Sequence, residues 1–382
     1  MREEPILLTP GPTPVPPDVL KTMGEPMIHH RTPQYQKIFR ETLEELRYVY
    51  QTKGDVIIFA SSGTGAMESA VANTLSPGER VLVLEAGVFG ERFTKITQRY
   101  GQKVERISVP YGQPMDTDRV LEYLKSQGRG LAAVFCQLSD TSTGIRMEVE
   151  QFARALAKTE TLLIVDAVSG LAVDPLKFDE WGVDVALSGS QKALMAPPGL
   201  SFAAVSEKAW RKIKLARNPR FYFDYLLAKE CYAQWDTPFT PAISIVRALA
   251  LSLARIQKEG LEAFMAREAR LAEAVREALG ALGLELFTKE SQTAGLTAVQ
   301  IPKGVDGAKL LSRLMNEFNI WMAGGQGSMK GKIMRIAHMG YIGKDDLIAG
   351  FDALETVLGD LGYKLKKGVS KEILEQQQGV SR

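Results

Sequence analysis

Two stretches near the middle of the chain decide the fold: TLLIVDAVSG at residues 161–170 and VDVALSGSQKALMAPPGLSFAAVS at residues 183–206. Both contain short apolar runs typical of buried strands, and each run gives way to small or polar residues. Strands that are apolar on both faces are typical of parallel sheets covered by helices on both sides. The two stretches therefore predict the centre of an α/β domain.

The same alternation of apolar runs and helical patterns extends over the first two thirds of the chain. Strands are expected at residues 56–60, 80–85, 131–136, 161–166, 183–188 and 200–206. Helical patterns separate most of them, at residues 32–50, 66–74, 90–100, 116–126 and 148–158. This order predicts a mostly parallel sheet flanked by helices.

The pattern changes beyond about Thr240, where a smaller α+β domain is expected. Helices are expected at residues 243–265, 266–282, 307–316 and 344–361, with a break near Gly260, and strands at residues 284–288, 296–301 and 333–337. Residues 364–382 are polar and Gln-rich, which is typical of a frayed helix or tail and not of a core. We therefore predict an N-terminal arm packed on the small domain, a large domain and a small domain, at residues 1–16, 17–258 and 259–382.

The composition excludes several classes of function. The 382 residues include 47 Lys and Arg against 45 Asp and Glu, so no basic field favours nucleic acid or an anionic membrane. The chain has three His and two Cys, and Cys136 and Cys231 stand too far apart for a metal motif, so neither a metal site nor a disulfide framework is expected. Without a signal pattern or an apolar run of about 20 residues, the sequence predicts a cytoplasmic protein.

Polar residues follow the predicted strands, and ligands bind at the carboxyl ends of parallel strands. The segment SSGTG at residues 61–65 leads into a helix and fits a phosphate, although an ordinary helix cap would also explain it. Asp166 ends a very apolar strand, where a carboxylate is costly to bury unless a cation such as a protonated pyridine nitrogen meets it. Asp166 could instead cap a helix or bind a metal.

Three further residues carry chemistry of the same kind. Lys192 lies between two predicted strands, where a desolvated amine could form a Schiff base, unless it is a surface lysine. Phe89 could stack on a planar ring or pack in the core. Arg335 could bind a substrate carboxylate or form a structural ion pair. Together, a phosphate cradle, a stacking ring, a carboxylate and a lysine describe a site for pyridoxal 5'-phosphate.

Motifs along nearly the whole chain also resemble the class V aminotransferases of the fold type I pyridoxal-phosphate enzymes, and most of all the serine-pyruvate and alanine-glyoxylate aminotransferase group. The motifs are LLTPGPTPVP, HHRTPQY, SSGTGAMES, GVFGERF, SDTSTG, VDAVSG, GSQKALMAPPG and MRIAHMG. The resemblance implies a large domain with a mostly parallel sheet and a smaller α+β domain. It also implies roles for individual residues.

By this resemblance, Lys192 forms the Schiff base with the cofactor and Asp166 binds its pyridine nitrogen. Phe89 stacks on one face of the ring, Val168 packs on the other, and Thr141 lies near the ring hydroxyl. The phosphate is held by Ser62, Gly63, Thr64 and Gln191. The substrate carboxylate is bound by Arg335, with help from the backbone around Gly11.

The resemblance further implies a homodimer in which the segment DTPFTPAIS reaches the neighbour's phosphate, with Thr240 the preferred contact and Thr237 the alternate. The expected reaction is a ping-pong transfer of the amino group of alanine or serine to glyoxylate or pyruvate. An aspartate or aminophosphonate donor stays open, because Arg31 could bind a distal acidic group. A lyase of the same fold, such as a cysteine desulfurase, and a non-catalytic subunit of a redox complex also stay open.

Overall fold

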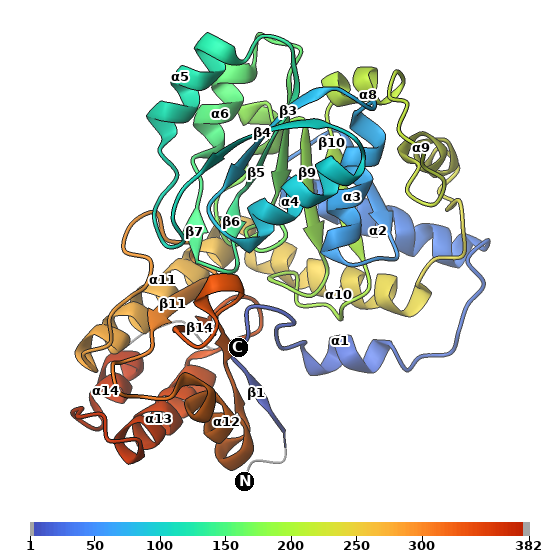
Figure 1. Cartoon of the computed structure of the whole chain (residues 1–382). Helices are drawn as coiled ribbons and strands as arrows, with labels where there is room; N and C mark the ends of the chain where they lie inside the picture. Colours follow the sequence, from blue (N-terminus) through green and yellow to red (C-terminus); the bar gives the residue numbers. More distant parts are fainter. Residues whose placement is uncertain (1–3, 377–382) are drawn as a thin grey trace.

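A seven-stranded sheet forms the centre of the larger part of the computed structural model, which describes residues 4–376 (Figure 1). The strands lie in the order β2-β10-β9-β8-β5-β3-β4. Their bounds are β2 (Asp55–Phe59), β3 (Arg80–Glu85), β4 (Lys103–Ser108), β5 (Leu131–Gln137), β8 (Leu162–Asp166), β9 (Val185–Gly189) and β10 (Ser201–Val205). The strand β10 runs in the opposite direction to the other six strands, so the predicted mostly parallel sheet is confirmed.

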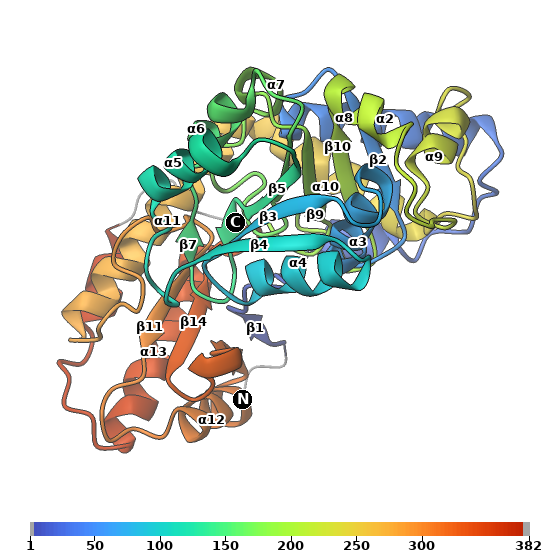
Figure 2. The same cartoon turned by 45° about the horizontal axis from the view of Figure 1, so that its top comes forward.

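Alternate residues of each central strand enter two different cores, one on each face of the sheet. In β8, for example, Leu163 and Val165 pack with one core, and Leu162 and Ile164 pack with the other. Figure 2 shows α3 (Gly63–Thr74) and α4 (Val88–Arg99) on one face, and α5 (Thr117–Gln127) and α6 (Val149–Leu156) on the other. This double burial explains why the strands are continuously apolar in sequence. The remaining helices of this part are α1 (Pro17–Thr22), α2 (Pro33–Tyr50), α7 (Phe178–Trp181), α8 (Glu207–Ile213), α9 (Tyr225–Tyr232) and α10 (Ile243–Glu259).

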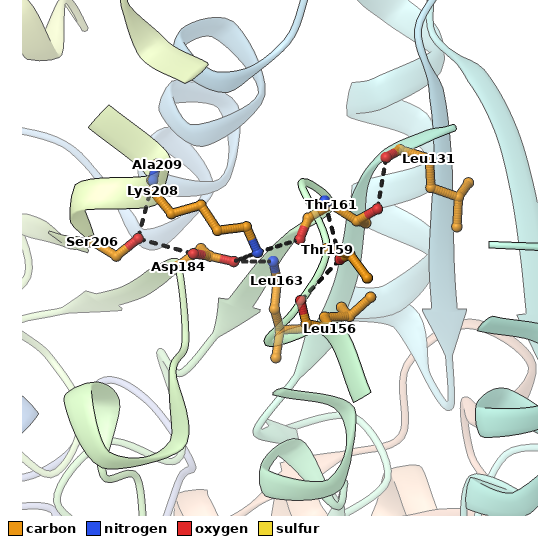
Figure 3. Close-up of polar contacts among 9 residues, drawn as sticks. All are labelled: Leu131, Leu156, Thr159, Thr161, Leu163, Asp184, Ser206, Lys208 and Ala209. Atoms are coloured by element: carbon orange, nitrogen blue, oxygen red, sulfur yellow. Dashed lines mark hydrogen bonds and ion pairs between the residues drawn. The ribbon is translucent and has the colours of Figure 1, made fainter. Parts of the chain in front are cut away.

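A closed polar network stabilises the amino ends of the central strands (Figure 3). The buried Asp184 carboxylate accepts hydrogen bonds from the Leu163 N–H (2.9 Å) and the Ser206 hydroxyl (2.9 Å), and lies 3.0 Å from the Lys208 Nζ atom. Ser206 also caps α8 by accepting from the Ala209 N–H. The charges of Asp184 and Lys208 are paired with each other, so this network stabilises the fold without needing a ligand.

The second part of the chain is smaller and mixes helices with a short antiparallel sheet. Its sheet has the order β11-β14-β13, and the arm joins this part because β1 pairs in parallel with β12. The bounds are β1 (Ile6–Leu7), α11 (Leu261–Ala281), β11 (Leu296–Gln300), α12 (Gly307–Phe318), β12 (Ile320–Trp321), β13 (Ala323–Gly324), β14 (Ile333–Ala337), α13 (Lys344–Asp360) and α14 (Val369–Glu375). The arm residues Ile6 and Leu8 are buried in the core that these elements share.

The structure corrects three predictions for this part. Residues 284–288 form no strand and contribute only an isolated bridge between Leu286 and Val299. The expected helix bounds of 243–265 and 266–282 were wrong, because α10 ends at Glu259 and α11 begins at Leu261. The predicted break near Gly260 is confirmed, and the φ of +88° at that residue suits glycine. The segment from residue 364 is not a simple tail, because α14 buries Leu374 in the core; residues 377–382 lie outside the described chain.

Among residues 4–376, no helix is both long enough and apolar enough to cross a bilayer.

The packing of α14 leads to a stability prediction. We expect Leu374→Ala to lower the free energy of unfolding by about 2–5 kcal/mol, because it removes a fully buried side chain and leaves a cavity. Urea unfolding of the purified protein measures this change. Leu215→Ala is the matched control, since Leu215 is 75% exposed. If both variants unfold like the wild type, α14 does not pack against the core.

Candidate active site

A pocket of about 260 Å³ lies at the carboxyl edge of the central sheet. Its wall contains ten residues that the sequence predicted for the site: Gly11, Ser62, Gly63, Thr64, Phe89, Thr141, Asp166, Val168, Gln191 and Lys192. They come from the arm and from the segments after five different strands, β2, β3, β5, β8 and β9. The parallel order of these strands explains why their carboxyl ends meet at one place.

Lys192 is buried in the turn that follows β9. Its Nζ atom donates to the Pro10 carbonyl, and a Cβ atom at Gly11 would lie 2.5 Å from Nζ. The φ of +133° at Gly11 favours glycine, which lets the arm approach the amine closely. Burial lowers the pKa of Lys192 to about 8, although the Asp166 carboxylate acts in the opposite direction. The amine is therefore partly unprotonated near neutral pH.

Asp166 ends β8 with its carboxylate buried at the pocket wall. Burial raises its pKa to about 6, while a hydrogen bond from the Val168 N–H (2.9 Å) favours the charged form. Among the described residues, no cationic side chain lies within ion-pair distance of this carboxylate. A cation inside the pocket would remove much of the cost of burying it.

The amino end of α3 forms another part of the wall. Ser62 precedes the helix without using its side chain as a cap, so the first N–H groups of the helix stay available to a ligand. Gly63 is required here because a Cβ atom would lie 2.9 Å from the Val168 side chain. The side-chain Oε1 atom of Gln191 is buried and has no hydrogen-bond partner among the described residues. This amide is therefore free to form a further hydrogen bond at the pocket wall.

Phe89 occupies the first turn of α4, and the fully buried Asp140 holds that turn in place. One Asp140 carboxylate oxygen accepts from the N–H groups of Phe89 (3.1 Å) and Gly90 (3.3 Å), and the other accepts from the Ser142 N–H (2.9 Å). Burial raises the pKa of Asp140, and these hydrogen bonds partly offset the shift. Sequence reasoning missed Asp140, although it lies within the motif SDTSTG.

Arg335 lies in β14 outside the pocket wall but is connected to it. Its Nη1 atom donates to the Thr141 carbonyl (2.8 Å), and its Nε and Nη2 atoms donate to the Gly324 carbonyl (3.0 and 2.8 Å). No carboxylate of the described chain lies within ion-pair distance of this buried guanidinium, so Arg335 does not form the structural ion pair that its sequence also allowed. Burial lowers its pKa to about 10.

Sequence reasoning missed Arg92, which lines the pocket one helical turn after Phe89. Its guanidinium carbon lies 4.5 Å from the centroid of the Phe89 ring, and its Nη1 atom donates to the Thr64 hydroxyl (2.8 Å). The available signal was the spacing of three residues from Phe89, which places both side chains on one face of a helix.

Other predicted or suspected residues lie elsewhere. Thr240 is exposed and lines a separate small pocket with Thr237, whose hydroxyl donates to the Phe239 carbonyl (2.8 Å). Arg31 forms an ion pair with Asp236 (2.5 Å) in the same region. None of the three histidines lines the Lys192 pocket, and the buried His338 is hydrogen-bonded to Thr297.

Comparisons with known proteins agree with this geometry. The class V aminotransferase family model matches residues 6–343. The chain is 41% identical over 365 residues to a protein named soluble hydrogenase, small subunit, of Synechococcus sp., covering 95% of each chain. It is 36% identical to the L-aspartate–glyoxylate aminotransferase of Paracoccus denitrificans, covering 96% of this chain and 94% of the relative.

Among solved structures, the alanine–glyoxylate aminotransferase of Nostoc sp. is 34% identical, with a TM-score of 0.90 over 94% of this chain and 96% of the other. The family match spans far more than half of the chain, and the predicted fold type I architecture is confirmed by this neighbour. The chain therefore belongs to the class V aminotransferase family, as its motifs predicted.

Proposed function

We propose that this aminotransferase binds pyridoxal 5'-phosphate in the pocket around Lys192 and transfers the amino group of a small L-amino acid to a 2-oxo acid. The observation that carries the proposal is the buried Lys192 amine, with its lowered pKa, in the same pocket as the buried Asp166 carboxylate. Membership of the class V family supports the same chemistry.

The pocket offers groups that match each part of this cofactor. The uncapped amino end of α3, with Ser62, Gly63 and Thr64, suits the phosphate. Rotation of the Gln191 amide, whose oxygen has no partner among the described residues, can turn its NH₂ group toward the phosphate as a donor. Asp166 suits a protonated ring nitrogen. The remaining wall residues would hold the ring, with Phe89 on one face, Val168 on the other and Thr141 near the ring hydroxyl.

When bound, the cofactor supplies an aldehyde that bonds to amines and a protonated ring that withdraws electrons from the reacting carbon. Lys192 would hold the cofactor through Nζ, and its free amine would accept the proton from the α-carbon of the amino acid as general base. Asp166 keeps the proton on the ring nitrogen. Arg335 orients the amino acid through its carboxylate, with backbone help at Gly11, so that the α-proton faces Nζ.

For the substrates, we propose alanine or serine as donor and glyoxylate or pyruvate as acceptor. The names of the Nostoc and Paracoccus relatives both include glyoxylate, and the former includes alanine. Aspartate is the second candidate donor, because the Paracoccus relative is named for it. Arg31 supports an acidic donor less well than its sequence position suggested, since Asp236 already pairs with it.

Two further activities have less support. A desulfurase needs a reactive cysteine, but Cys136 is buried in β5 and Cys231 lies on α9, and burial raises the pKa of both thiols. The name of the Synechococcus relative suggests a subunit of a redox complex, for which co-purifying chains are the observation to seek. Two unpaired cysteines fit a reducing compartment, so we propose a cytoplasmic location.

We further propose a homodimer in which Thr240 of one subunit reaches the phosphate site of the other. Thr240 is exposed and its neighbours form an aromatic patch, in which the ring of Phe239 lies 5.2 Å from Tyr222 and 5.7 Å from Phe221. Phe221 is 78% exposed in the single chain, and such patches commonly mark interfaces. Thr237 is the weaker choice because its hydroxyl already donates to Phe239.

Lys192→Ala tests the reaction directly. Wild-type protein loaded with pyridoxal 5'-phosphate should be yellow, with an absorbance band that shifts when L-alanine or L-serine is added. Turnover should be measured with alanine, serine and aspartate against glyoxylate, pyruvate and 2-oxoglutarate. Loss of the general base should lower the rate by about 10²–10⁴-fold or more. Lys158→Ala is the control, because Lys158 is exposed and its variant should turn over like the wild type. Undiminished turnover by Lys192→Ala would refute the proposed reaction.

The lowered pKa of Lys192 predicts a pH dependence of cofactor attachment to the apoprotein. Only the unprotonated amine attacks an aldehyde, so the rate should rise about tenfold per pH unit at low pH and level off above about 8. Asp166→Asn should move this midpoint to lower pH, because the carboxylate raises the pKa of Lys192. Stopped-flow absorbance measures the profile. A rise that continues to the ordinary lysine value of 10.5 would contradict the buried amine.

The shared site predicts different effects for two threonines. Thr240→Val should weaken binding of pyridoxal 5'-phosphate by roughly tenfold, because it removes a hydrogen bond to a charged group, and should leave pyridoxal binding unchanged. Thr237→Val should instead affect stability, since its hydroxyl bonds within the chain. Size-exclusion chromatography gives the oligomeric state, and a fully active monomer would exclude the shared site.

A further inference from the structure

Arg92 is a cation in the pocket wall that the proposed reaction does not use. It projects from α4 beside Phe89, and its guanidinium carbon lies 4.5 Å from that ring's centroid. Its Nη1 atom donates to the Thr64 hydroxyl, at the start of α3. One side chain therefore connects the aromatic wall to the uncapped helix end.

The charge of Arg92 has no internal counter-charge. No carboxylate of residues 4–376 lies within ion-pair distance of its guanidinium, whereas Arg267 and Arg313 each pair with two carboxylates. The adjacent Glu91 is occupied elsewhere, because its carboxylate accepts from the Tyr111 hydroxyl and lies 4.0 Å from Lys95. Arg92 thus adds net positive charge to a pocket edge that already carries the positive end of a helix.

The field of this charge reaches the centre of the pocket. Arg92 adds to the lowering of the Lys192 pKa and partly opposes the rise that burial causes in the Asp166 pKa. A positive charge lowers both values because it disfavours an ammonium and favours a carboxylate. A doubly charged anion near Thr64 would balance this excess positive charge.

We propose that Arg92 binds the cofactor phosphate together with the amino end of α3, and holds the Phe89 ring in place with its flat face. This inference rests on the proposed function and deepens it. The planar guanidinium can offer one edge to phosphate oxygens while its face stacks on an aromatic ring, which a lysine ammonium cannot reproduce.

A substrate carboxylate is the competing anion, and the contacts favour the phosphate. The bond to Thr64 places Arg92 at the helix end that suits a phosphate. The substrate carboxylate belongs near Arg335, whose Nη1 atom donates to Thr141 after a different strand. Arg92 therefore stands on the phosphate side of the pocket.

Binding of two cofactor forms to the apoprotein tests the assignment without using activity. Pyridoxal 5'-phosphate and pyridoxal share the ring and the aldehyde and differ only in the phosphate, and titration followed by absorbance gives both affinities. The variants are Arg92→Gln, which removes the positive charge, and Arg92→Lys, which keeps the charge but lacks the planar guanidinium group. Arg99→Gln is the matched control, since Arg99 is exposed at the other end of α4.

We expect Arg92→Gln to bind pyridoxal 5'-phosphate at least about tenfold more weakly than the wild type, because the variant loses a hydrogen bond between charged groups. Its affinity for pyridoxal should stay within about twofold of the wild-type value. Arg92→Lys should fall between Arg92→Gln and the wild type, and Arg99→Gln should match the wild type. Unfolding without cofactor checks that Arg92→Gln is folded; if it is not, the same comparison with Arg92→Lys decides.

Equal losses for both cofactor forms, or no loss for either, would overturn the phosphate contact. A higher KM for aspartate alone, with unchanged cofactor affinity, would overturn it in favour of a substrate role. Failure of the wild type to bind either aldehyde would overturn the proposed function and this inference with it. This outcome differs from a failure of the Arg92 assignment alone, in which the wild type still binds pyridoxal 5'-phosphate.

Discussion

Burial of the Lys192 amine is the constraint on which the rest of the site depends. A buried ammonium is costly, so the structure surrounds it with groups that fix its place and moderate its charge. The arm contributes most: the Pro10 carbonyl accepts from Nζ, and the Thr13 N–H and hydroxyl donate to the carbonyls of Gln191 (3.1 Å) and Lys192 (2.9 Å). Because the arm strand β1 also pairs with β12, the reacting amine is tied to the smaller part of the chain.

The two edges of the central sheet differ in whether their buried charges have partners within the chain. At the amino edge, Asp184 is paired with Lys208 and accepts two further hydrogen bonds, so the network is complete without a ligand. At the carboxyl edge, Asp166 and Arg92 have no ion-pair partner within the described chain. Incomplete pairing at one edge and complete pairing at the other distinguish a binding site from a structural network.

Local pattern predicted the sheet and part of the pocket, because apolar runs mark strands and the residues after parallel strands converge. This pattern indicated the segment 61–65, Phe89, Asp166 and Lys192, whereas Gly11, Thr141, Val168 and Gln191 were expected from the family resemblance alone. Features set by tertiary contacts were not predictable in this way. The edge strand β4, KVERIS, contains three charged residues and buries only Ile107, so it lacks the continuous apolar run of the central strands. The helix α14 is polar except for the few side chains that it buries. Arg92 was missed because its spacing from Phe89 places it on the same helix face but does not show whether that face meets a pocket or solvent.

Asp140 connects two parts of the pocket region, the first turn of α4 and the segment whose carbonyl meets Arg335. Its carboxylate fixes the first turn of α4, and so the Phe89 ring, and it also orders the loop after β5 through Ser142. The carbonyl of Thr141, inside that loop, accepts from Arg335. A shift of this loop would therefore move the Phe89 ring and the Arg335 guanidinium together. Since Arg335 lies in β14 and Phe89 in α4, the segment around Asp140 connects the smaller sheet to the wall of the pocket.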